Sequence, residues 1–290
     1  MSKTSCAPFI TVPMIIPART GSLSRMDLLY GQGNALFSAG RYHEALARFS
    51  EVVKHSPEHF QAWTLQGFSL AADKRYEDAI ASFSQALALN PKHSLAWHGK
   101  GHALAQLRQF EEAIAHLQQA VRFNPKDYKA WYNLGTAQNQ LNQYKAAINS
   151  FDHSLQLNQR NYRVWYNKAV ALCGLQEYEG ALLILNTALK IKPSAHYIWN
   201  QRGTTLAQLG RYGEALQSFE MSLHHQVDNP NAWYGKARVY ALKGDIEQTL
   251  KHLYRTFVLS PYVYRVMVQI DAHFDALRTH PHFQALVEPS

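Results

Sequence analysis

Apolar residues between positions 63 and 91 fall into two blocks, and within each block they recur at steps of three and four residues. Such steps place them on one face of an α-helix. A polar break at residues 72–75 separates the blocks, and Pro91 ends the second block because proline cannot continue the helical hydrogen-bond ladder. The pattern predicts a helical hairpin with an apolar face on each helix.

The hairpin pattern repeats along the chain with a period of 34 residues. The six tryptophans mark this period, at Trp63, Trp97, Trp131, Trp165, Trp199 and Trp233. With tryptophan as the fourth residue, the units are 26–59, 60–93, 94–127, 128–161, 162–195, 196–229 and 230–263. One hairpin cannot bury its apolar faces alone, so the period predicts a stack of seven hairpins.

Several places within the unit keep one kind of residue. The eighth place is always small, the seventeenth is aromatic except in the last unit, and the twentieth is alanine except in that unit. The twenty-fourth place holds Phe49, Phe83, Leu117, Phe151, Leu185, Phe219 and Leu253. Proline occupies the thirty-second place in all units but the fourth and the sixth. Small residues let two helices approach closely, and the large ones fill the space between neighbouring hairpins.

This set of residues resembles the tetratricopeptide repeat, a family whose units begin with W-x-x-L-G and end with phenylalanine and proline. The resemblance covers residues 26–261. It implies an all-α, right-handed α-solenoid of tandem hairpins that binds proteins and performs no catalysis. Local departures are Leu29 in the tryptophan place of the first unit, and Ile246 and Thr249 in the last unit. Residues 262–290 are expected to form a capping helix and tail that cover the last apolar face.

Residues 1–25 lie outside the period. Their apolar run is interrupted by Pro8, Pro13 and Pro17, and it is too short and too rich in proline to span a bilayer. We expect a flexible apolar and basic leader, with a weak anchor at a membrane surface as the alternative. The two cysteines, Cys6 and Cys173, show no disulfide spacing, which fits a reducing compartment such as the cytoplasm.

The net charge of +8 favours an acidic partner. This class includes protein segments, nucleic acid and anionic membrane surfaces. Periodic aromatic residues on a basic chain suit base stacking, but the tryptophan place packs inside the hairpin in the family that the chain resembles. We therefore expect an acidic protein or peptide partner, no nucleic acid, and at most peripheral contact with a membrane.

Family geometry implies that the first helices of the units line the inner wall of the solenoid. At the wall-facing places the chain has few acids and many amides and tyrosines. The expected partner-binding residues are His98, His102, Lys129, Tyr132, Asn133, Thr136, Arg163, Tyr166, Asn167, Asn200, Gln201, Tyr234 and Arg238. Asn133, Asn167 and Gln201 follow one another at the sixth place, and each amide offers a donor and an acceptor to a peptide backbone. This row is similar to the asparagine ladder in the arrays of O-linked sugar transferases.

Other interpretations of these residues have less support. The carboxylate clamp of chaperone cochaperones would match only at Asn133 and Arg163. His98 and His102 have the spacing of metal ligands on a helix, but no carboxylate or cysteine nearby in the sequence completes the set, so no metal is expected. The chain contains no P-loop, dinucleotide fingerprint or nucleophile elbow, so we expect neither an enzyme nor a cofactor.

Two further expectations concern charge. Cations occupy the seventh place in four units, where we expect their stems to cover apolar surface and their charges to stay in water; these are Lys100, Lys168, Arg202 and Lys236. Four histidines are expected near the inner wall: His59, His93, His98 and His102. Free histidine titrates near pH ~6.5, so the groove should gain positive charge and bind an acidic partner more tightly at pH ~6 than at pH ~8.

Repeats this regular, and this rich in tryptophan, glutamine and asparagine, are similar to those of cyanobacterial tetratricopeptide proteins. Several of those are assembly factors for photosystems or pigment-synthesis enzymes at the thylakoid surface. The resemblance implies a scaffold or adaptor that assists assembly, either in the cytoplasm or on the surface of a thylakoid membrane. A regulatory subunit of an enzyme and, with less support, a nucleic-acid-binding helical repeat protein stay open as alternatives. The oligomeric state stays open as well.

Overall fold

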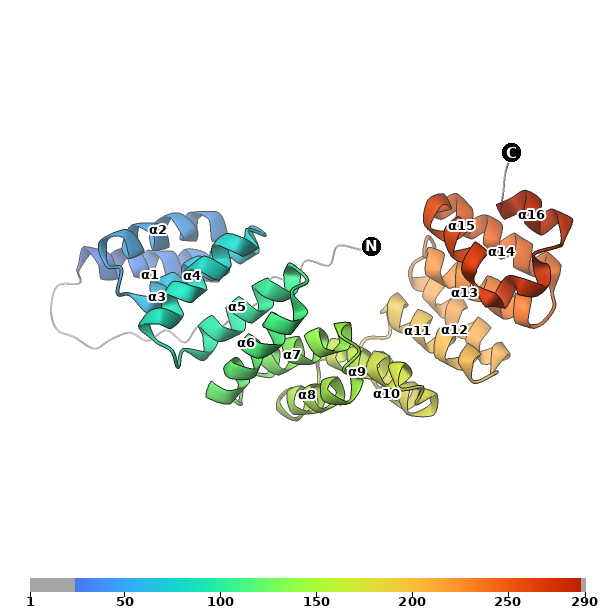
Figure 1. Cartoon of the computed structure of the whole chain (residues 1–290), viewed down its shortest axis with the longest axis horizontal. Helices are drawn as coiled ribbons and strands as arrows, with labels where there is room; N and C mark the ends of the chain where they lie inside the picture. Colours follow the sequence, from blue (N-terminus) through green and yellow to red (C-terminus); the bar gives the residue numbers. More distant parts are fainter. Residues whose placement is uncertain (1–23, 288–290) are drawn as a thin grey trace. The chain divides into compact units, whose positions relative to one another are not determined.

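The computed structural model describes residues 24–287, and the elements of this part are helices joined by short connections (Figure 1). They are α1 (Arg25–Ser38), α2 (Tyr42–His55), α3 (Phe60–Ala72), α4 (Tyr76–Leu89), α5 (Ser94–Gln106), α6 (Phe110–Phe123), α7 (Tyr128–Gln140), α8 (Tyr144–Leu157), α9 (Tyr162–Gly174), α10 (Tyr178–Ile191), α11 (His196–Gln208), α12 (Tyr212–His225), α13 (Pro230–Leu242), α14 (Ile246–Leu259), α15 (Pro261–Ile270), the 3-10 helix η1 (Ala272–Leu277) and α16 (Pro281–Val287). The chain divides into two compact units between Gln143 and Tyr144.

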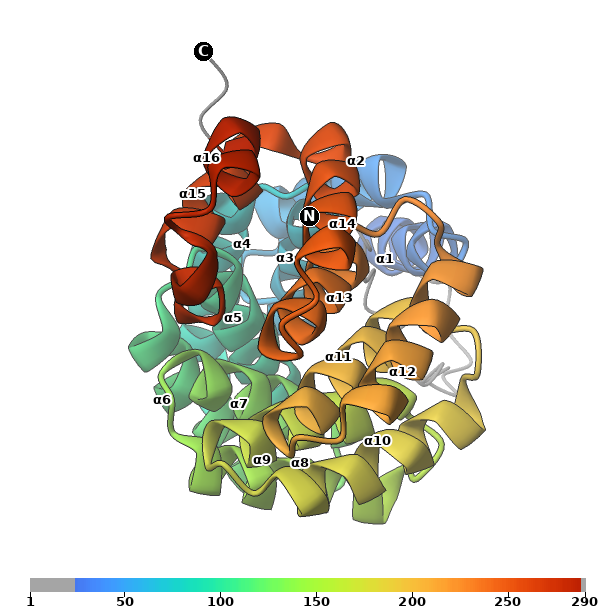
Figure 2. The same ribbon diagram turned by 90° about the vertical axis from the view of Figure 1, so that its right-hand side faces the viewer.

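Both units are built from pairs of helices. In the first unit α1 packs on α2, α3 on α4 and α5 on α6, and each second helix also packs on the first helix that follows it, up to α7. The second unit begins with α8 and continues with the hairpins α9–α10, α11–α12 and α13–α14. Figure 2 shows these pairs from a second direction. The expected all-α fold of tandem hairpins is therefore confirmed, with one hairpin in each 34-residue period.

Each hairpin turns through one residue in the left-handed backbone region, always at the fifteenth place. Glycine fills this place in three units, with φ between 73° and 76°. In the other four units the residue is Lys74, Arg108, Asn142 or Gln176, with φ between 57° and 64°. A residue with a side chain is strained there by roughly 1–2 kcal/mol. The packing of the two apolar faces therefore holds a turn that the local residue does not favour.

In four of the 34-residue repeats the last residue caps the first helix of the following repeat. His59, Asp127, Asn161 and Asn229 occupy the thirty-fourth place, and their side chains accept hydrogen bonds from backbone N–H groups in the first turn that follows. Such capping satisfies donors that have no partner within the helix. In these four repeats the thirty-fourth place is thus a joint to the next repeat rather than an open part of the wall, whereas His93 and Ala195 make no such bond.

The large residues of the twenty-fourth place form the centre of the stack. From Phe49 to Leu253 each of them is at most 1 % exposed. Gly67 and Gly99 both lie against the Phe83 ring, and a Cβ on either glycine would come within 2.7 Å of a ring carbon. The period therefore places small residues where a neighbouring ring needs the space.

Each tryptophan fills space beside its hairpin and also holds a turn. All six indoles are partly buried, and each Nε1 donates to the main-chain carbonyl six residues earlier, at 2.8–3.1 Å. The acceptor is usually the proline at the thirty-second place, but Gln159 and Val227 accept in the units that lack it. The indole therefore fixes the connection between units whether or not proline is present, since the acceptor is the main chain.

The chain departs from the repeat after Leu259. Elsewhere four residues separate a second helix from the next first helix, but here Ser260 alone stands between α14 and α15. In place of the single capping helix that the sequence suggested, α15, η1 and α16 cover the last hairpin, and Phe274 and Phe283 lie in its core. Almost all of the expected leader, residues 1–25, lies outside the described residues, so its two interpretations stay predictions.

Candidate protein-binding face

The first helices of consecutive hairpins contact one another within each unit. In the first unit this holds for α1, α3, α5 and α7, and in the second unit for α9, α11 and α13. The residues expected to bind a partner lie on α5 and α7 in the first unit and on α9, α11 and α13 in the second. The two sets therefore belong to different units, and each has its own surroundings.

In the first unit, His98 belongs to a buried hydrogen-bonded network. The residue is 5 % exposed. Its Nδ1 lies 2.9 Å from the Oδ2 of Asp127, and its Nε2 lies 2.8 Å from the Nδ2 of Asn133. Because an amide nitrogen only donates, Nε2 accepts, and the ring proton sits on Nδ1 and is donated to Asp127. The network joins α5 to the start of α7, so His98 connects two consecutive hairpins within the first unit.

The same network places a carboxylate beside His98, which the spacing of residues along the chain did not suggest. Burial acts to raise the pKa of Asp127, but hydrogen bonds from His98 and from the N–H groups of Ala130 and Lys129 outweigh burial and hold that pKa below its usual range. The carboxylate caps α7 through its other oxygen. Among the described residues no group of three or more histidine, cysteine, aspartate or glutamate side chains is suited to a metal ion.

The expected protonation of this wall near pH ~6 does not fit the surroundings of the histidines. Burial, with a smaller contribution from His98, lowers the pKa of His102 to about 4. Burial also lowers the pKa of His59 and of His93. Burial disfavours the imidazolium at all three rings, because the charged form would lose its hydration there. These shifts oppose the predicted acid-enhanced binding through the histidines, most strongly at His102.

The remaining first-unit residues lie on α7 and are half-buried. Lys129 sits 5.8 Å from the centroid of the Tyr128 ring, and burial lowers its pKa although Asp127 acts in the opposite direction. The hydroxyl of Thr136 donates to the carbonyl of Tyr132 at 2.9 Å. Lys129 is thus the positive group that the first unit offers near Asp127.

In the second unit, α9 and α11 bring aromatic, cationic and amide groups together. Tyr166 and Tyr197 meet edge to face with ring centroids 5.0 Å apart. The guanidinium of Arg163 stands 5.9 Å from the centroid of Tyr162, and its Nε donates to the phenolic oxygen at 3.4 Å. Burial raises the pKa of Tyr197, so its hydroxyl stays protonated. Asn167 lies half-buried on the same helix as Arg163.

The two amides of α11 differ in how they are satisfied. The Nε2 of Gln201 lies 3.6 Å from the sulfur of Cys173, a weak acceptor that also contacts the hydroxyl of Thr205 at 3.4 Å. The Oδ1 of Asn200 is buried and accepts no hydrogen bond from any described residue. A buried carbonyl without a donor is costly in a native structure. We call Arg163, Tyr166, Asn167, Tyr197, Asn200 and Gln201 the α9–α11 face.

Tyr234 and Arg238 of α13 are engaged by the cap. Tyr234 is 5 % exposed, and its hydroxyl donates to the Oδ2 of Asp271 at 2.8 Å. Arg238 has its Nε 3.3 Å from the same oxygen and its Nη2 3.1 Å from the ring nitrogens of His273. Tyr234 is therefore closed to a partner by the cap. Arg238 pairs with Asp271 and His273, although its Nε makes no hydrogen bond to a described residue, so its part in partner binding stays a prediction.

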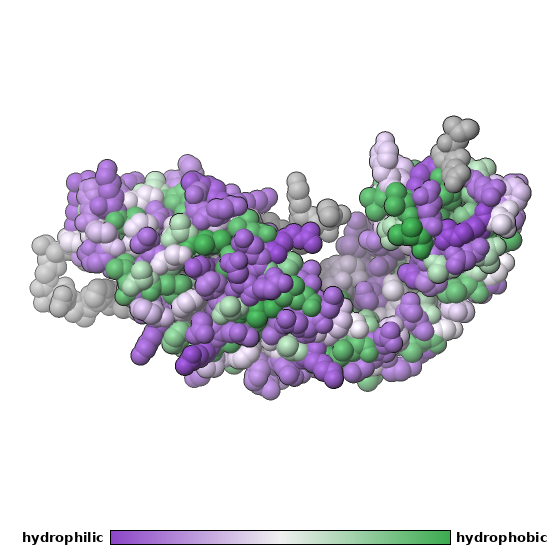
Figure 3. Space-filling model, in the orientation of Figure 1, coloured by the Kyte–Doolittle hydropathy of each residue, from purple (hydrophilic) through white to green (hydrophobic). Residues whose placement is uncertain are grey.

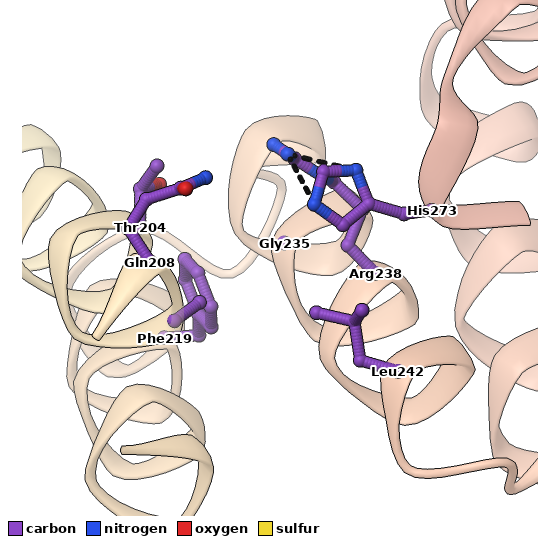
Figure 4. Close-up of a pocket in the computed structure, with 8 residues that line it drawn as sticks. Thr204, Gln208, Phe219, Gly235, Arg238, Leu242 and His273 are labelled. Carbon is purple, nitrogen blue, oxygen red and sulfur yellow. Dashed lines mark hydrogen bonds between the residues drawn. The ribbon is translucent and has the colours of Figure 1, made fainter. Parts of the chain in front are cut away.

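A small hollow remains beside this cap (Figure 4). It is lined by Thr204, Ala207, Gln208, Phe219, Gly235, Arg238, Leu242 and His273. Figure 4 shows Arg238 and His273 turned toward each other on one side of it, with Thr204 and Gln208 on the other side. Since the charge of Arg238 is already matched by Asp271, the hollow offers little to an acidic ligand.

The seventh-place cations connect consecutive 34-residue repeats, and the sequence analysis did not predict these contacts. Lys168 donates to Asp152 at 2.5 Å and Lys236 to Glu220 at 3.2 Å, and both lysine side chains are mostly buried. Arg202 donates to the Oδ1 of Asn186 at 2.9 Å. The two residues of each pair are 16 positions apart in the sequence, and this common spacing could have predicted the contacts. The expectation that these charges stay in water is wrong for the two lysines.

Models of the tetratricopeptide repeat match residues 30–94 and 200–255, 70–141, and 128–161. Among curated proteins no match is found. Across residues 24–287, every helix is too short or too polar to traverse a lipid bilayer.

Solved structures share the fold at low sequence identity. A tetratricopeptide repeat protein from Parabacteroides merdae ATCC 43184 is similar over 84% of this chain and 96% of its own, with 16% identity and a TM-score of 0.63. YrrB, described as a tetratricopeptide repeat protein with an unusual peptide-binding site, is similar over 63% of this chain and 94% of its own, with 23% identity and a TM-score of 0.52. PilF of Pseudomonas aeruginosa is similar over 71% of this chain and 93% of its own, with 14% identity and a TM-score of 0.60.

Proposed function

Because the chain belongs to the tetratricopeptide repeat family, we propose that it is a non-enzymatic scaffold that binds an extended segment of a partner protein on the α9–α11 face. The family consists in general of interaction scaffolds rather than enzymes. YrrB, which shares the fold, is described as having a peptide-binding site. The proposal for this chain rests on its own side chains rather than on that likeness.

The buried, unpartnered Oδ1 of Asn200 is the observation that carries the proposal. The oxygen is closed off from the surface, but Asn200 as a whole is half-buried. A turn of its side chain would bring Oδ1 to a backbone N–H of an extended peptide, and the net gain of a neutral hydrogen bond is about 0.5–1.5 kcal/mol. Tyr166 and Tyr197 offer apolar ring surface beside it, and Arg163 supplies positive charge. The positive charge of Arg163 favours an acidic segment as the partner. This charge stays constant across physiological pH.

The test begins with the partner. The full chain captures its partner from a lysate with and without nuclease, and the affinity of the purified partner segment is then compared between wild type and Asn200→Ala. We expect a loss of roughly three- to tenfold, because one neutral hydrogen bond disappears. Asn149→Ala is the matched control, since Asn149 is an exposed asparagine on a second helix of the same unit. An affinity that Asn200→Ala leaves unchanged would place the binding face elsewhere.

Salt then tests the charge of the partner. Binding of an acidic segment should weaken as ionic strength rises, and Arg163→Ala should reduce that dependence. The narrower role suggested by the style of the repeats, an assembly factor for a photosynthetic or pigment-synthesis complex, stays a prediction that the captured partner would decide. A cytoplasmic location, or a peripheral one on a thylakoid membrane, stays a prediction in the same way.

A further inference from the structure

The cap exposes an apolar helix face that no described residue covers. α15 buries Tyr264 and Val268 against the last hairpin. On its other side Tyr262 is 87 % exposed, Ile270 79 %, and Val263, Val266 and Met267 between 39 % and 61 %. At 3.6 residues per turn these five side chains span an arc of roughly 140°. Figure 3 shows hydrophobic residues gathered where Figure 1 draws α15.

We propose that this α15 face, consisting of Tyr262, Val263, Val266, Met267 and Ile270, packs against the same face of a second copy of the chain. An apolar stripe this wide on a helix normally faces another helix. The repeat places no such helix there, because α15 begins directly after Ser260 and leaves the phase of the earlier first helices.

The charges around α15 favour a second copy over other occupants. The five residues of the face are uncharged, and the only charged residue of α15 is Arg265. Arg265 turns back into the protein, where it donates to the carbonyls of Leu286 and Val287 at 3.1 Å and lies 4.9 Å from the centroid of Phe257. A surface for anionic lipid or an acidic segment would present cations around its apolar residues. The exposed cations Lys251 and Arg255 belong to α14. The α15 face itself is neutral, so it can meet the same face of a second copy without direct contact between like charges.

The spacing along α15 suits an antiparallel pair. Tyr262, Val266 and Ile270 form one ridge at four-residue steps. Across a twofold axis through the middle of this ridge, Val266 meets Val266 of the second copy, and Tyr262 meets Ile270 of the second copy. Such an interface is isologous, and interdigitating ridges of this kind are the commonest helix contact in globular proteins.

The exposed area suits a weak dimer. The five residues of the α15 face leave on the order of 600 Å² of surface open, at the usual area of large side chains. A standard interface buries about 800 Å² on each partner. We therefore expect a dimer that forms at concentrations on the order of tens of micromolar.

Sedimentation velocity of the full chain over a range of concentrations tests this pairing. The wild type should sediment as a dimer at about 100 µM and dissociate on dilution. Val266→Glu with Ile270→Glu should weaken the dimer at least tenfold, because carboxylates of the two copies would face each other at the axis. Leu183→Glu is the matched control, since Leu183 is 69 % exposed on α10 and should leave the dimer unchanged.

A cross-link tests the geometry independently. In a background of Cys6→Ser and Cys173→Ser, Val266→Cys should form a disulfide-linked dimer under mild oxidation, whereas Leu183→Cys should not. A wild type that stays monomeric at about 100 µM would overturn the proposal, and so would a dimer that the two glutamates leave intact. A monomer that binds phosphatidylglycerol vesicles through Val266 and Ile270 would also overturn it and assign the face to a membrane. Each of these readouts is independent of partner binding at Asn200.

Discussion

Adding one methyl group at Gly99 should destabilise the first unit, while the same change at Gly31 should stabilise it. Both glycines occupy the sixth place of their units, in the interior of α5 and α1. A Cβ on Gly99 would lie 2.3 Å from Cζ of Phe83, whereas a Cβ on Gly31 would meet no heavy atom within 4 Å. The two substitutions therefore differ in packing and agree in their effect on the helical backbone.

The magnitude follows from two opposed contributions. Replacing glycine by alanine within a helix gains roughly 0.5–1 kcal/mol. Overpacking a core costs typically 1–3 kcal/mol, and the Phe83 ring has little room to move, because Gly67 also lies close against it and the residue is fully buried. Gly31→Ala should thus gain about 0.5–1 kcal/mol and Gly99→Ala should lose about 1–2 kcal/mol. The difference between the variants isolates the packing cost, since the backbone contribution cancels.

Urea unfolding followed by tryptophan fluorescence measures both variants, and hydrogen exchange locates the loss in α4 and α5. A third variant tests the mechanism. Phe83→Leu in the Gly99→Ala background should recover part of the stability, because leucine lacks the Cζ that the added Cβ would meet. If Gly99→Ala stabilises the protein as much as Gly31→Ala does, the ring is not held tightly and the reasoning fails.

Two further predictions concern α5 and α7. The folded pKa of His102, about 4, lies below its unfolded value near ~6.5, so the unfolded state binds more protons between these values and stability falls as pH drops through that window. The loss should reach about 1–2 kcal/mol between pH ~7 and pH ~5, and His102→Gln should reduce it when urea midpoints are compared. Asn133→Ala should lower the thermal midpoint by removing the donor to the buried Nε2 of His98, a cost of about 1–3 kcal/mol; an unchanged midpoint would mean that this hydrogen bond contributes nothing.

The repeat itself could be predicted from the sequence, because its residues are set by packing that recurs every 34 positions. Alanine at the twentieth place and phenylalanine or leucine at the twenty-fourth are buried in every hairpin where they occur. The start of three first helices could also have been predicted, since Asp127, Asn161 and Asn229 are residue types that cap helices. The period could not predict the path of the chain after Leu259. The repeat ends there, and α15 begins after one residue instead of four.

The wall was harder to predict, because a place in the repeat fixes the direction of a side chain but not its partner. The fifth place was expected to face a ligand. Two of its residues, His98 and Tyr30, reach the thirty-fourth place of their own unit, where His98 bonds to Asp127 and the Tyr30 ring lies 4.6 Å from His59. A third, Tyr234, reaches the cap. These contacts depend on the distance between neighbouring hairpins, which a single sequence does not specify.

This difference changes which amide is important for recognition. In the expected ladder at the sixth place, Asn133 already donates to His98, and Gln201 points at the sulfur of Cys173. Removing either group disturbs contacts within the protein, so loss of binding by such variants would not separate recognition from stability. Asn200 stands one residue before Gln201, at the fifth place, and its buried Oδ1 has no donor among the described residues. A ligand that donates to this oxygen removes a cost that the folded chain already bears. Asn200→Ala should therefore weaken binding without lowering stability, whereas Asn133→Ala lowers stability whether or not a partner is present.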